Sequence, residues 1–168
     1  MYTKEEEMLL QSAIIYAADA MKTCHNNKPV LVHSLKLANY LYKYGYDMSV
    51  VIGALFHDLV EDTDTTLDDI KQKFGSTISE LVNLLTMDFK IDDYYQQFVA
   101  NFERLANNKD AIIIRCVDIM DNARYIKLAP EETQKKVKDK HIYFYNKYKD
   151  ILQNEPLWND FKAIISAE

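Results

Sequence analysis

The chain has 168 residues, 48% of them hydrophobic, which is enough to form the core of one domain. Its net charge of −6 disfavours a nucleic-acid partner, because binding to a nucleic-acid backbone depends on many lysine and arginine contacts. Two cysteines are too few for a disulfide scaffold, and no apolar stretch is long enough to cross a membrane. We therefore expect a single cytoplasmic domain, residues 1–168, with no membrane partner.

The spacing of apolar residues predicts an all-helical chain. Only three glycines and three prolines are present, which favours helices joined by short turns. The predicted helices span residues 4–22, 31–44, 48–61, 66–74, 76–87, 92–106, 109–124, 131–149 and 156–166. Gly45 and Gly75 are suited to end two of them. Thr66 with Asp69 resembles a capping box at the start of another.

The most informative segment is residues 57–63, HDLVEDT, where the predicted helix 48–61 finishes. Residues 50–56 before it are apolar throughout, so we expect this helix to be buried on both sides. Ionisable groups in such a place are costly unless they are paired or bind a metal. On a continuous helix His57 lies one turn before Glu61, and Asp58 lies one turn before Asp62. The segment therefore predicts two adjacent rows of ligand-type atoms that face one pocket.

Two more metal-competent residues lie elsewhere in the chain. His33 is near the start of an amphipathic segment, and Asp118 ends the apolar run that begins at residue 111. With His57 and Asp58 they form a set of two imidazoles and two carboxylates. Such a set, without thiolate, favours manganese, iron or zinc over a soft ion and leaves coordination positions for water.

These residues occur in the order His, His-Asp, Asp, which resembles the HD-domain metal-dependent phosphohydrolases. Residues 29–124 resemble more closely the hydrolase domain of the RelA/SpoT alarmone enzymes, above all the stand-alone small alarmone hydrolases and the animal SpoT-like enzymes. The motifs that carry this resemblance are Pro-x-x-x-His at 29–33, HDxVEDT at 57–63, Phe-Gly at 74–75 and Asp-x-x-x-Asn-x-Arg at 118–124. The resemblance implies an HD-domain helical bundle in one compact domain.

The resemblance also implies roles for individual residues. The residues that would hold a single Mn²⁺, with Fe²⁺ or Zn²⁺ as other candidates, are His33, His57, Asp58 and Asp118. Glu61 and Asp62 would orient and deprotonate the attacking water, and Asn122 and Arg124 would lie near the ribose and the phosphates of the nucleotide. The implied reaction removes the 3′-pyrophosphate from guanosine-3′,5′-bis(diphosphate), or ppGpp. Its partner is a small-molecule nucleotide, and the sequence indicates no oligomeric state.

One segment departs from this family. Where the family has His-x-x-Gln-x-Arg and a longer loop, residues 21–28 are shorter and contain no arginine. Lys22 or Lys28 could supply charge to bind the substrate, but a lysine cannot reproduce the fork or the stacking plane of a guanidinium. The substrate could therefore be another nucleotide, such as NADPH through its 2′-phosphate. A second alternative is a nucleotide sensor without hydrolysis, although the intact pair Glu61 and Asp62 favours an enzyme.

Other polar and aromatic residues carry weaker expectations. Arg104, Arg115 and Lys127 are possible helpers of Arg124 in a positive region around the substrate. Asp121 is expected to be solvated, and His141 is expected to be a surface or capping histidine. The aromatic residues of segment 143–148 are expected to pack the last long helix onto the core.

Overall fold

The computed structural model describes residues 1–24 and 29–167, and every regular element among them is an α-helix. This confirms the all-helical prediction. The chain divides into two compact units, Met1–Thr86 and Met87–Glu168. The organisation of residues 1–168 as one functional domain stays a prediction.

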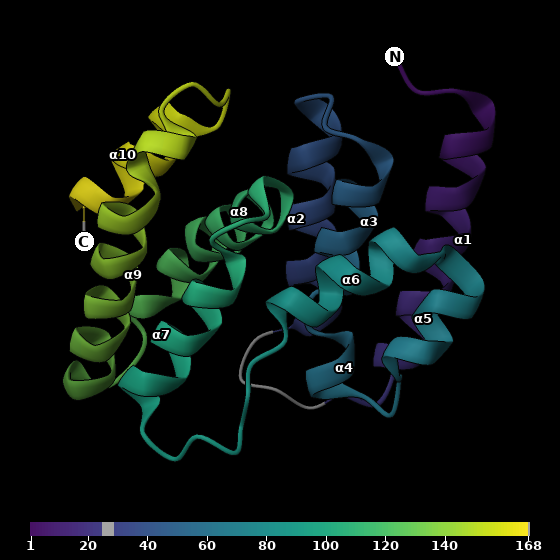
Figure 1. The fold of residues 1–168 in the computed structure, drawn as a ribbon. Coiled ribbons are helices and arrows are strands. Elements are labelled where there is room, and N and C mark those ends of the chain that lie inside the picture. Colours follow the sequence, from purple (N-terminus) through teal and green to yellow (C-terminus); the bar gives the residue numbers. More distant parts are fainter. Residues whose placement is uncertain (25–28, 168) are drawn as a thin grey trace. The chain divides into compact units, whose positions relative to one another are not determined.

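The first unit is built around α3. Its helices are α1 (Lys4–Met21), α2 (Val30–Lys43), α3 (Met48–Phe56), α4 (Leu59–Asp62), α5 (Leu67–Phe74) and α6 (Ser76–Leu85). Helix α3 contacts α1, α2 and α6, as Figure 1 shows. All of its residues except Ser49 are buried, which confirms the expectation from the apolar run. The end of α3 is therefore held firmly by its neighbours.

The predicted continuous helix 48–61 is wrong, because the chain leaves the helical path at the most informative motif. Helix α3 ends at Phe56, and α4 is a separate single turn. Between them Asp58 has φ −100° and ψ −1°, a sparsely populated backbone region in which many active-site residues lie. Thr63 closes the turn, because its hydroxyl donates to the carbonyl of Leu59 at 2.6 Å. The spacing of one helical turn that we assumed between His57 and Glu61 does not hold.

The predicted start and end of α5 are confirmed. Thr66 accepts a hydrogen bond from the backbone of Asp69, whose carboxylate accepts one from the backbone of Thr66. Gly75 then joins α5 to α6 with φ 94°, and Gly45 follows α2 with φ 75°. Both values fall in the region that residues other than glycine rarely adopt.

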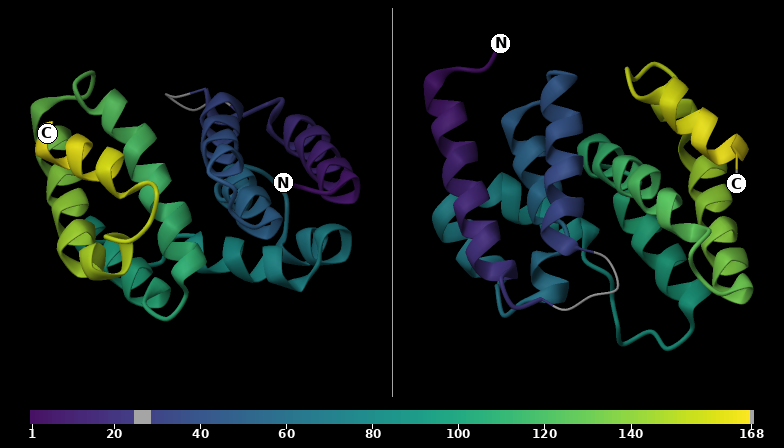
Figure 2. Two further views of the ribbon diagram at one scale, coloured as in Figure 1. Left: turned by 90° about the horizontal axis from the view of Figure 1, so that it is seen from above. Right: turned by 180° about the vertical axis from the view of Figure 1, so that it is seen from behind.

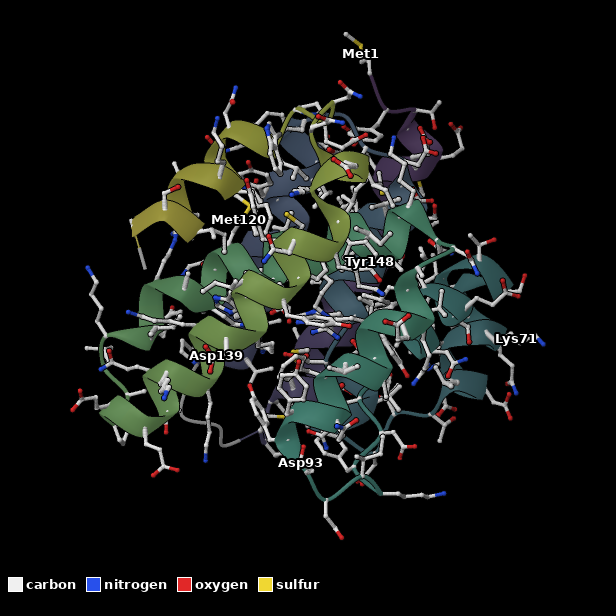
Figure 3. All side chains as sticks on the ribbon, turned by 60° about the vertical axis from the view of Figure 1, so that its left-hand side comes forward. Met1, Lys71, Asp93, Met120, Asp139 and Tyr148 are labelled. Atoms are coloured by element: carbon white, nitrogen blue, oxygen red, sulfur yellow. The ribbon has the colours of Figure 1, made fainter. Side chains whose placement is uncertain are left out.

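The second unit consists of four helices. They are α7 (Tyr94–Leu105), α8 (Lys109–Ile126), α9 (Glu131–Leu152) and α10 (Trp158–Ala167). Helix α8 contacts the other three, and α9 contacts α7 and α10 (Figure 2). Asp93, labelled in Figure 3, begins α7 by accepting a hydrogen bond from the backbone of Gln96.

Aromatic side chains form much of the core of the second unit. Phe144 and Tyr148 are buried, which confirms the packing role predicted for this segment. Tyr148 points from α9 toward α7 (Figure 3), and its hydroxyl donates to the carbonyl of Phe102. His141 is also buried, so the surface position predicted for it is wrong. It lies three residues before Phe144, on the inner face of the same helix.

Two further observations concern the class of protein. None of the helices in residues 1–24 and 29–167 combines the length and the apolar character that a membrane span requires. Cys24 and Cys116 are both free thiols. The cytoplasmic location stays a prediction.

Candidate metal centre

Three of the predicted metal ligands meet in the first unit. Nε2 of His33 lies 3.3 Å from Nε2 of His57, which in turn lies 3.0 Å from Oδ1 of Asp58. Oδ2 of Asp58 lies 4.0 Å from Nε2 of His33. One ligand atom from each side chain is thus within 4.8 Å of the other two. Ligands of one divalent ion, each about 2 Å from it, have this kind of spacing.

The helix break explains how two adjacent residues reach the same point. Side chains of neighbouring residues on a regular helix diverge by about 100°. His57 is the last residue of the α3 path, whereas Asp58 lies in the turn that follows it. His33 approaches from the first turn of α2. Both histidines are buried, and Asp58 is partly accessible.

The hydrogen bond of His57 to the backbone suits the ring for metal binding. Its Nδ1 lies 2.8 Å from the carbonyl oxygen of Ala54, which can only accept a hydrogen bond. In the neutral ring the proton is therefore on Nδ1, and the lone pair of Nε2 faces His33 and Asp58. Two imidazole nitrogens and a carboxylate, arranged in this way, fit a borderline divalent ion.

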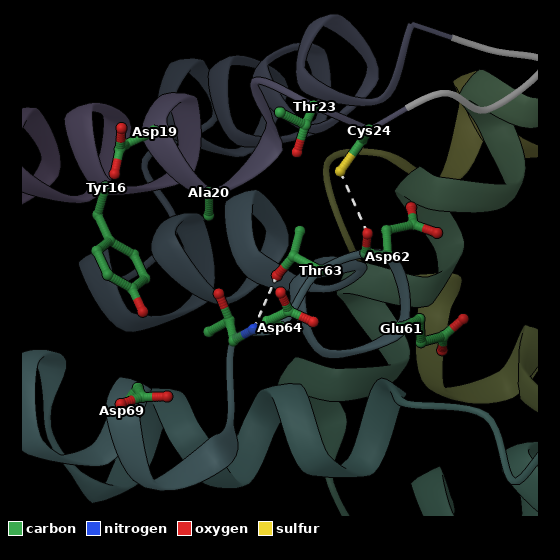
Figure 4. Close-up of a pocket in the computed structure, with 11 residues that line it drawn as sticks. Tyr16, Asp19, Ala20, Thr23, Cys24, Glu61, Asp62, Thr63, Asp64 and Asp69 are labelled. Carbon is green, nitrogen blue, oxygen red and sulfur yellow. Dashed lines mark hydrogen bonds between the residues drawn. The ribbon is translucent and has the colours of Figure 1, made fainter.

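The predicted catalytic residues Glu61 and Asp62 line a cavity of about 670 Å³ in the first unit. Figure 4 shows their side chains at one end of this cavity, with Tyr16, Asp19 and Asp69 at the other end. Cys24 fixes the first end to the end of α1, because its Sγ donates to the carbonyl of Asp62 at 3.2 Å. Burial raises the pKa of the Cys24 thiol, and the charge of Asp62 raises it further, so the thiol stays protonated at neutral pH.

The charge of this cavity is one-sided. Five of the residues that the structure describes along its walls are carboxylates, and none is a lysine or an arginine. The five are Asp19, Glu61, Asp62, Asp64 and Asp69. Such a cavity can activate a water or face a cation, but its described lining offers no cationic partner for a phosphate group.

The fourth predicted ligand, Asp118, belongs to the second unit, where it lies on α8 and is buried. Both of its carboxylate oxygens accept hydrogen bonds. Arg115 donates from Nη1 to Oδ2 at 2.8 Å, and Asn122 donates from Nδ2 to Oδ1 at 2.6 Å. The other terminal nitrogen of Arg115 donates to Oδ1 of Asn101 on α7 at 3.2 Å. Coordination of one ion by Asp118 together with the cluster of the first unit stays a prediction.

Tyr94 at the start of α7 lies within electrostatic range of Asp118. Burial raises the pKa of the Tyr94 hydroxyl, and the negative charge of Asp118 raises it further, whereas Lys136 lowers it. The ring packs edge-on against Phe98 with a centroid distance of 5.8 Å. An aromatic side chain that is partly exposed therefore accompanies the carboxylate in this unit.

The residues predicted to bind substrate lie in different surroundings. Asn122 contacts Asp118, as described above. Lys22 is exposed and forms an ion pair with Asp19 at 2.7 Å. Lys28 lies outside the described residues. The roles predicted for these three in binding substrate stay predictions.

Arg124 faces another part of the second unit. With Lys127 and Ile164 it lines a cavity of about 350 Å³, and its Nη1 lies 3.8 Å from Oδ1 of Asp121. Asp121 is buried, so the solvated position predicted for it is wrong. The next residue, Asn122, lies on the same face of α8 as Asp118, to which it donates a hydrogen bond. Arg124 instead lines the cavity with Lys127 and Ile164. The predicted role of Arg124 in binding substrate stays a prediction.

The sequence did not predict the contacts of three groups near Asp118 and His57, namely Arg115, Asn101 and the backbone carbonyl of Ala54. Arg115 was considered only as a helper for the substrate, although its spacing of three residues from Asp118 is a detectable signal for an ion pair on a helix. Asn101 had no such signal, because an asparagine in an amphipathic helix is more often exposed. The backbone carbonyl of Ala54 is likewise invisible in a sequence.

Comparisons with known proteins identify the family of the chain. The family model described as HD domain matches residues 13–147. A guanosine-3′,5′-bis(diphosphate) 3′-pyrophosphohydrolase of Aquifex aeolicus is 33% identical over 122 residues, which make up 70% of this chain and 17% of that protein. A probable GTP pyrophosphokinase of Mycobacterium leprae is 29% identical over 142 residues, which make up 79% of this chain and 18% of that protein. The chain thus spans less than a fifth of the length of these two relatives.

Solved structures support the same fold. One is a metazoan orthologue of SpoT that hydrolyses ppGpp, with a TM-score of 0.77 and 22% identity, covering 99% of this chain and 97% of that chain. Another is a protein of Listeria monocytogenes with a TM-score of 0.72 and 22% identity, covering 84% of this chain and 98% of that chain. The helical fold, the cluster at the HDLVEDT motif and the matched residues 13–147 lead to one conclusion: the chain belongs to the HD domain family and is related to ppGpp hydrolases.

Proposed function

We propose that this chain is a divalent-metal-dependent phosphohydrolase that converts ppGpp to GDP and pyrophosphate. The observation that carries the proposal is the convergence of His33, His57 and Asp58 at the break between α3 and α4. The choice of ppGpp rests on the relatives, since the Aquifex aeolicus enzyme carries that activity in its name.

The donor set fits a borderline divalent ion, and Asp118 is proposed as the fourth ligand. Manganese is the ion implied by the resemblance to the alarmone hydrolases, and Fe²⁺ or Zn²⁺ would suit the same nitrogen and oxygen donors. A bound ion would supply positive charge for the phosphoryl oxygens and would lower the pKa of a water toward neutrality. Both imidazoles are buried, so they shield their side of the cluster from water.

Glu61 and Asp62 are proposed to orient the attacking water and to accept its proton. Both lie just after the cluster in sequence and line an open cavity, which gives a water access. The water oxygen bonds to the phosphorus that is attached to the ribose 3′ oxygen, and the bond between that phosphorus and the 3′ oxygen breaks. The accepted proton then passes to the leaving 3′ oxygen, so that pyrophosphate and a free 3′ hydroxyl are formed.

Asn122, Lys22, Lys28 and Arg124 are proposed to contact the nucleotide. Asn122 is beside Asp118 and can reach a substrate that approaches that carboxylate. Lys22 is near the end of α1, which also carries one wall of the acidic cavity. Lys28 and Arg124 complete the set implied by the resemblance.

A second candidate function is hydrolysis of another nucleotide, including removal of the 2′-phosphate of NADPH. It is favoured by the segment 21–28, which lacks the arginine with which the alarmone hydrolases help to hold the nucleotide. A sensor that binds nucleotide without hydrolysis is the third possibility, and the pair Glu61 and Asp62 argues against it.

One experiment separates these functions. The Mn²⁺-loaded chain is incubated with ppGpp, NADPH and a panel of common nucleotides and deoxynucleotides, and the products are separated by ion-exchange chromatography. Formation of GDP and pyrophosphate, absent with Asp58→Ala, would support the proposal. Phosphate release from a different nucleotide would show that the substrate is not ppGpp. Binding of a nucleotide without turnover would show that the chain is a sensor and not an enzyme.

A further inference from the structure

A row of polar side chains crosses the contact between α7 and α8 in the second unit. It runs from Asn101 through Arg115 and Asp118 to Asn122, with successive hydrogen bonds of 3.2, 2.8 and 2.6 Å. Asn101, Arg115 and Asp118 are 1%, 8% and 3% exposed. Apolar residues near them in the sequence, Phe98, Phe102, Ile114 and Ile119, are all buried as well.

Stability alone is a poor reason for this row. Replacing a buried ion pair by apolar side chains of similar size is often neutral or stabilising, because the charges lose their hydration. The two helices also bury the apolar residues Phe98, Phe102, Ile114 and Ile119, so the polar row is not needed to supply buried side chains. What the polar row adds is a fixed orientation for the carboxylate of Asp118.

The geometry shows how the orientation is fixed. Oδ2 of Asp118 is bonded to a cation and Oδ1 to a neutral amide, so that turning the carboxylate would break two hydrogen bonds. Arg115 cannot follow such a turn, because its second terminal nitrogen is bonded to Asn101 on the neighbouring helix.

We propose that Arg115 and Asn101 are positioning residues that orient Asp118 for metal coordination before any ion binds. This inference rests on the proposed function, in which Asp118 is a metal ligand. The conformational freedom of the carboxylate is lost when the protein folds, so that it is not lost again when the ion binds. Outer groups that hold a metal ligand contribute about 10-fold to 100-fold in metal affinity.

The change in metal affinity on removing the anchor of Arg115 distinguishes positioning from simple electrostatics. A positive guanidinium close to a metal ligand repels the ion. If Arg115 acted only through its charge, removing the hydrogen bond that anchors Arg115 would therefore not weaken metal binding. Asn101→Ala keeps that charge and removes only the anchor of Arg115. Positioning predicts weaker metal binding in this variant, whereas a charge effect alone predicts no change.

The test is an isothermal calorimetric titration of Mn²⁺ alone into the full chain, from which metal has been removed with EDTA, and it measures the Kd for Mn²⁺. Thermal unfolding is recorded for each variant. We expect the Kd to rise about tenfold in Asn101→Ala. It should return to within about twofold in Asn101→Asp, which keeps an oxygen for Arg115. Glu103→Gln is the matched control, because it breaks the ion pair of Glu103 with Lys147, which joins α7 to α9, and leaves the polar row intact.

An unchanged Kd in Asn101→Ala would overturn the inference. If that variant does not fold, Arg115→Lys takes its place, because a lysine reaches Asp118 or Asn101 but not both. We expect its Kd to rise severalfold, and a wild-type Kd would again overturn the inference. Asp118→Ala separates the two proposals. If this variant binds Mn²⁺ with wild-type affinity, the ligand set itself is refuted. If it loses Mn²⁺ affinity while the Kd of Asn101→Ala stays unchanged, only the positioning is refuted.

Discussion

Nε2 of His33 and Nε2 of His57 lie 3.3 Å apart, although 24 residues separate them in the sequence. The ring of His57 is already fixed by the carbonyl of Ala54, so this contact places the ring of His33 against a defined lone pair. It joins the start of α2 to the end of α3 at the point where the chain turns into α4.

Metal binding and turnover should be separable by mutation. Asp58→Ala removes one of the three converging ligands and should lose bound metal and activity together. Glu61→Ala should keep the metal and lower kcat by about 100-fold or more, because it removes a proton acceptor from the cavity and leaves the cluster intact. Metal content by atomic absorption and kcat from initial rates check both outcomes.

Asp68→Ala provides the control for that pair. Asp68 is an exposed carboxylate in the first turn of α5, and it lines no part of the acidic cavity. It should leave metal content and turnover unchanged. A fully active Asp58→Ala with a normal metal content would refute the ligand assignment.

Removal of the metal should abolish activity without unfolding the chain. The imidazole of His57 and the carboxylate of Asp118 are held by hydrogen bonds within the protein, and both units have apolar cores of their own. Circular dichroism after treatment with EDTA should show the same helical content. Adding Mn²⁺ should raise Tm in a concentration-dependent way, because the ion binds only the folded state. Loss of helical signal on chelation would contradict this.

The link between α5 and α6 should be sensitive to a single methyl group. Gly75 has φ 94° and ψ 167°, and a Cβ added there meets nothing within 4 Å, so the cost of Gly75→Ala is conformational. We expect about 1–3 kcal/mol of lost stability in urea unfolding. Gly45→Ala, at φ 75°, should cost about 1–2 kcal/mol. Wild-type stability for both variants would show that the two turns relax freely.

Base selection should be weak. Because segment 21–28 contains no arginine, no described guanidinium fork is available from it to read the base. Matched adenosine and guanosine substrates should therefore differ in kcat/KM by less than about tenfold, which corresponds to about 1.4 kcal/mol. A larger guanine preference, measured under identical metal concentrations, would contradict this and point to a recognition element elsewhere in the chain.

Local chemistry made parts of the fold predictable. The apolar run 50–56 indicated a helix buried on all sides, and Thr66 with Asp69 indicated a helix start, because both effects act within a few residues. The break at Asp58 was not predictable in the same way. Its backbone departs from the helix next to the contact of His57 with His33, and a contact between residues 24 positions apart cannot be read from the local sequence.

The same limit applies to the second unit. Helix α8 buries residues around its whole circumference, so its sequence has no clear polar face from which the position of Asp121 could be read. The burial of Asp121 and His141 therefore appeared only in the structure. Asn101 became a candidate for a role only when α7 was seen to bring it to Arg115.

The carboxylates that line the cavity beside Glu61 and Asp62 also affect how a substrate arrives. A polyanionic nucleotide that approaches this cavity on a protein of net charge −6 is repelled at long range. Monovalent salt shortens that repulsion to about 10 Å at 0.1 M, so the association rate should rise with ionic strength. Proteins that attract nucleotides through basic surfaces show the opposite dependence, so for the proposed nucleotide substrate we expect faster association in salt than in dilute buffer.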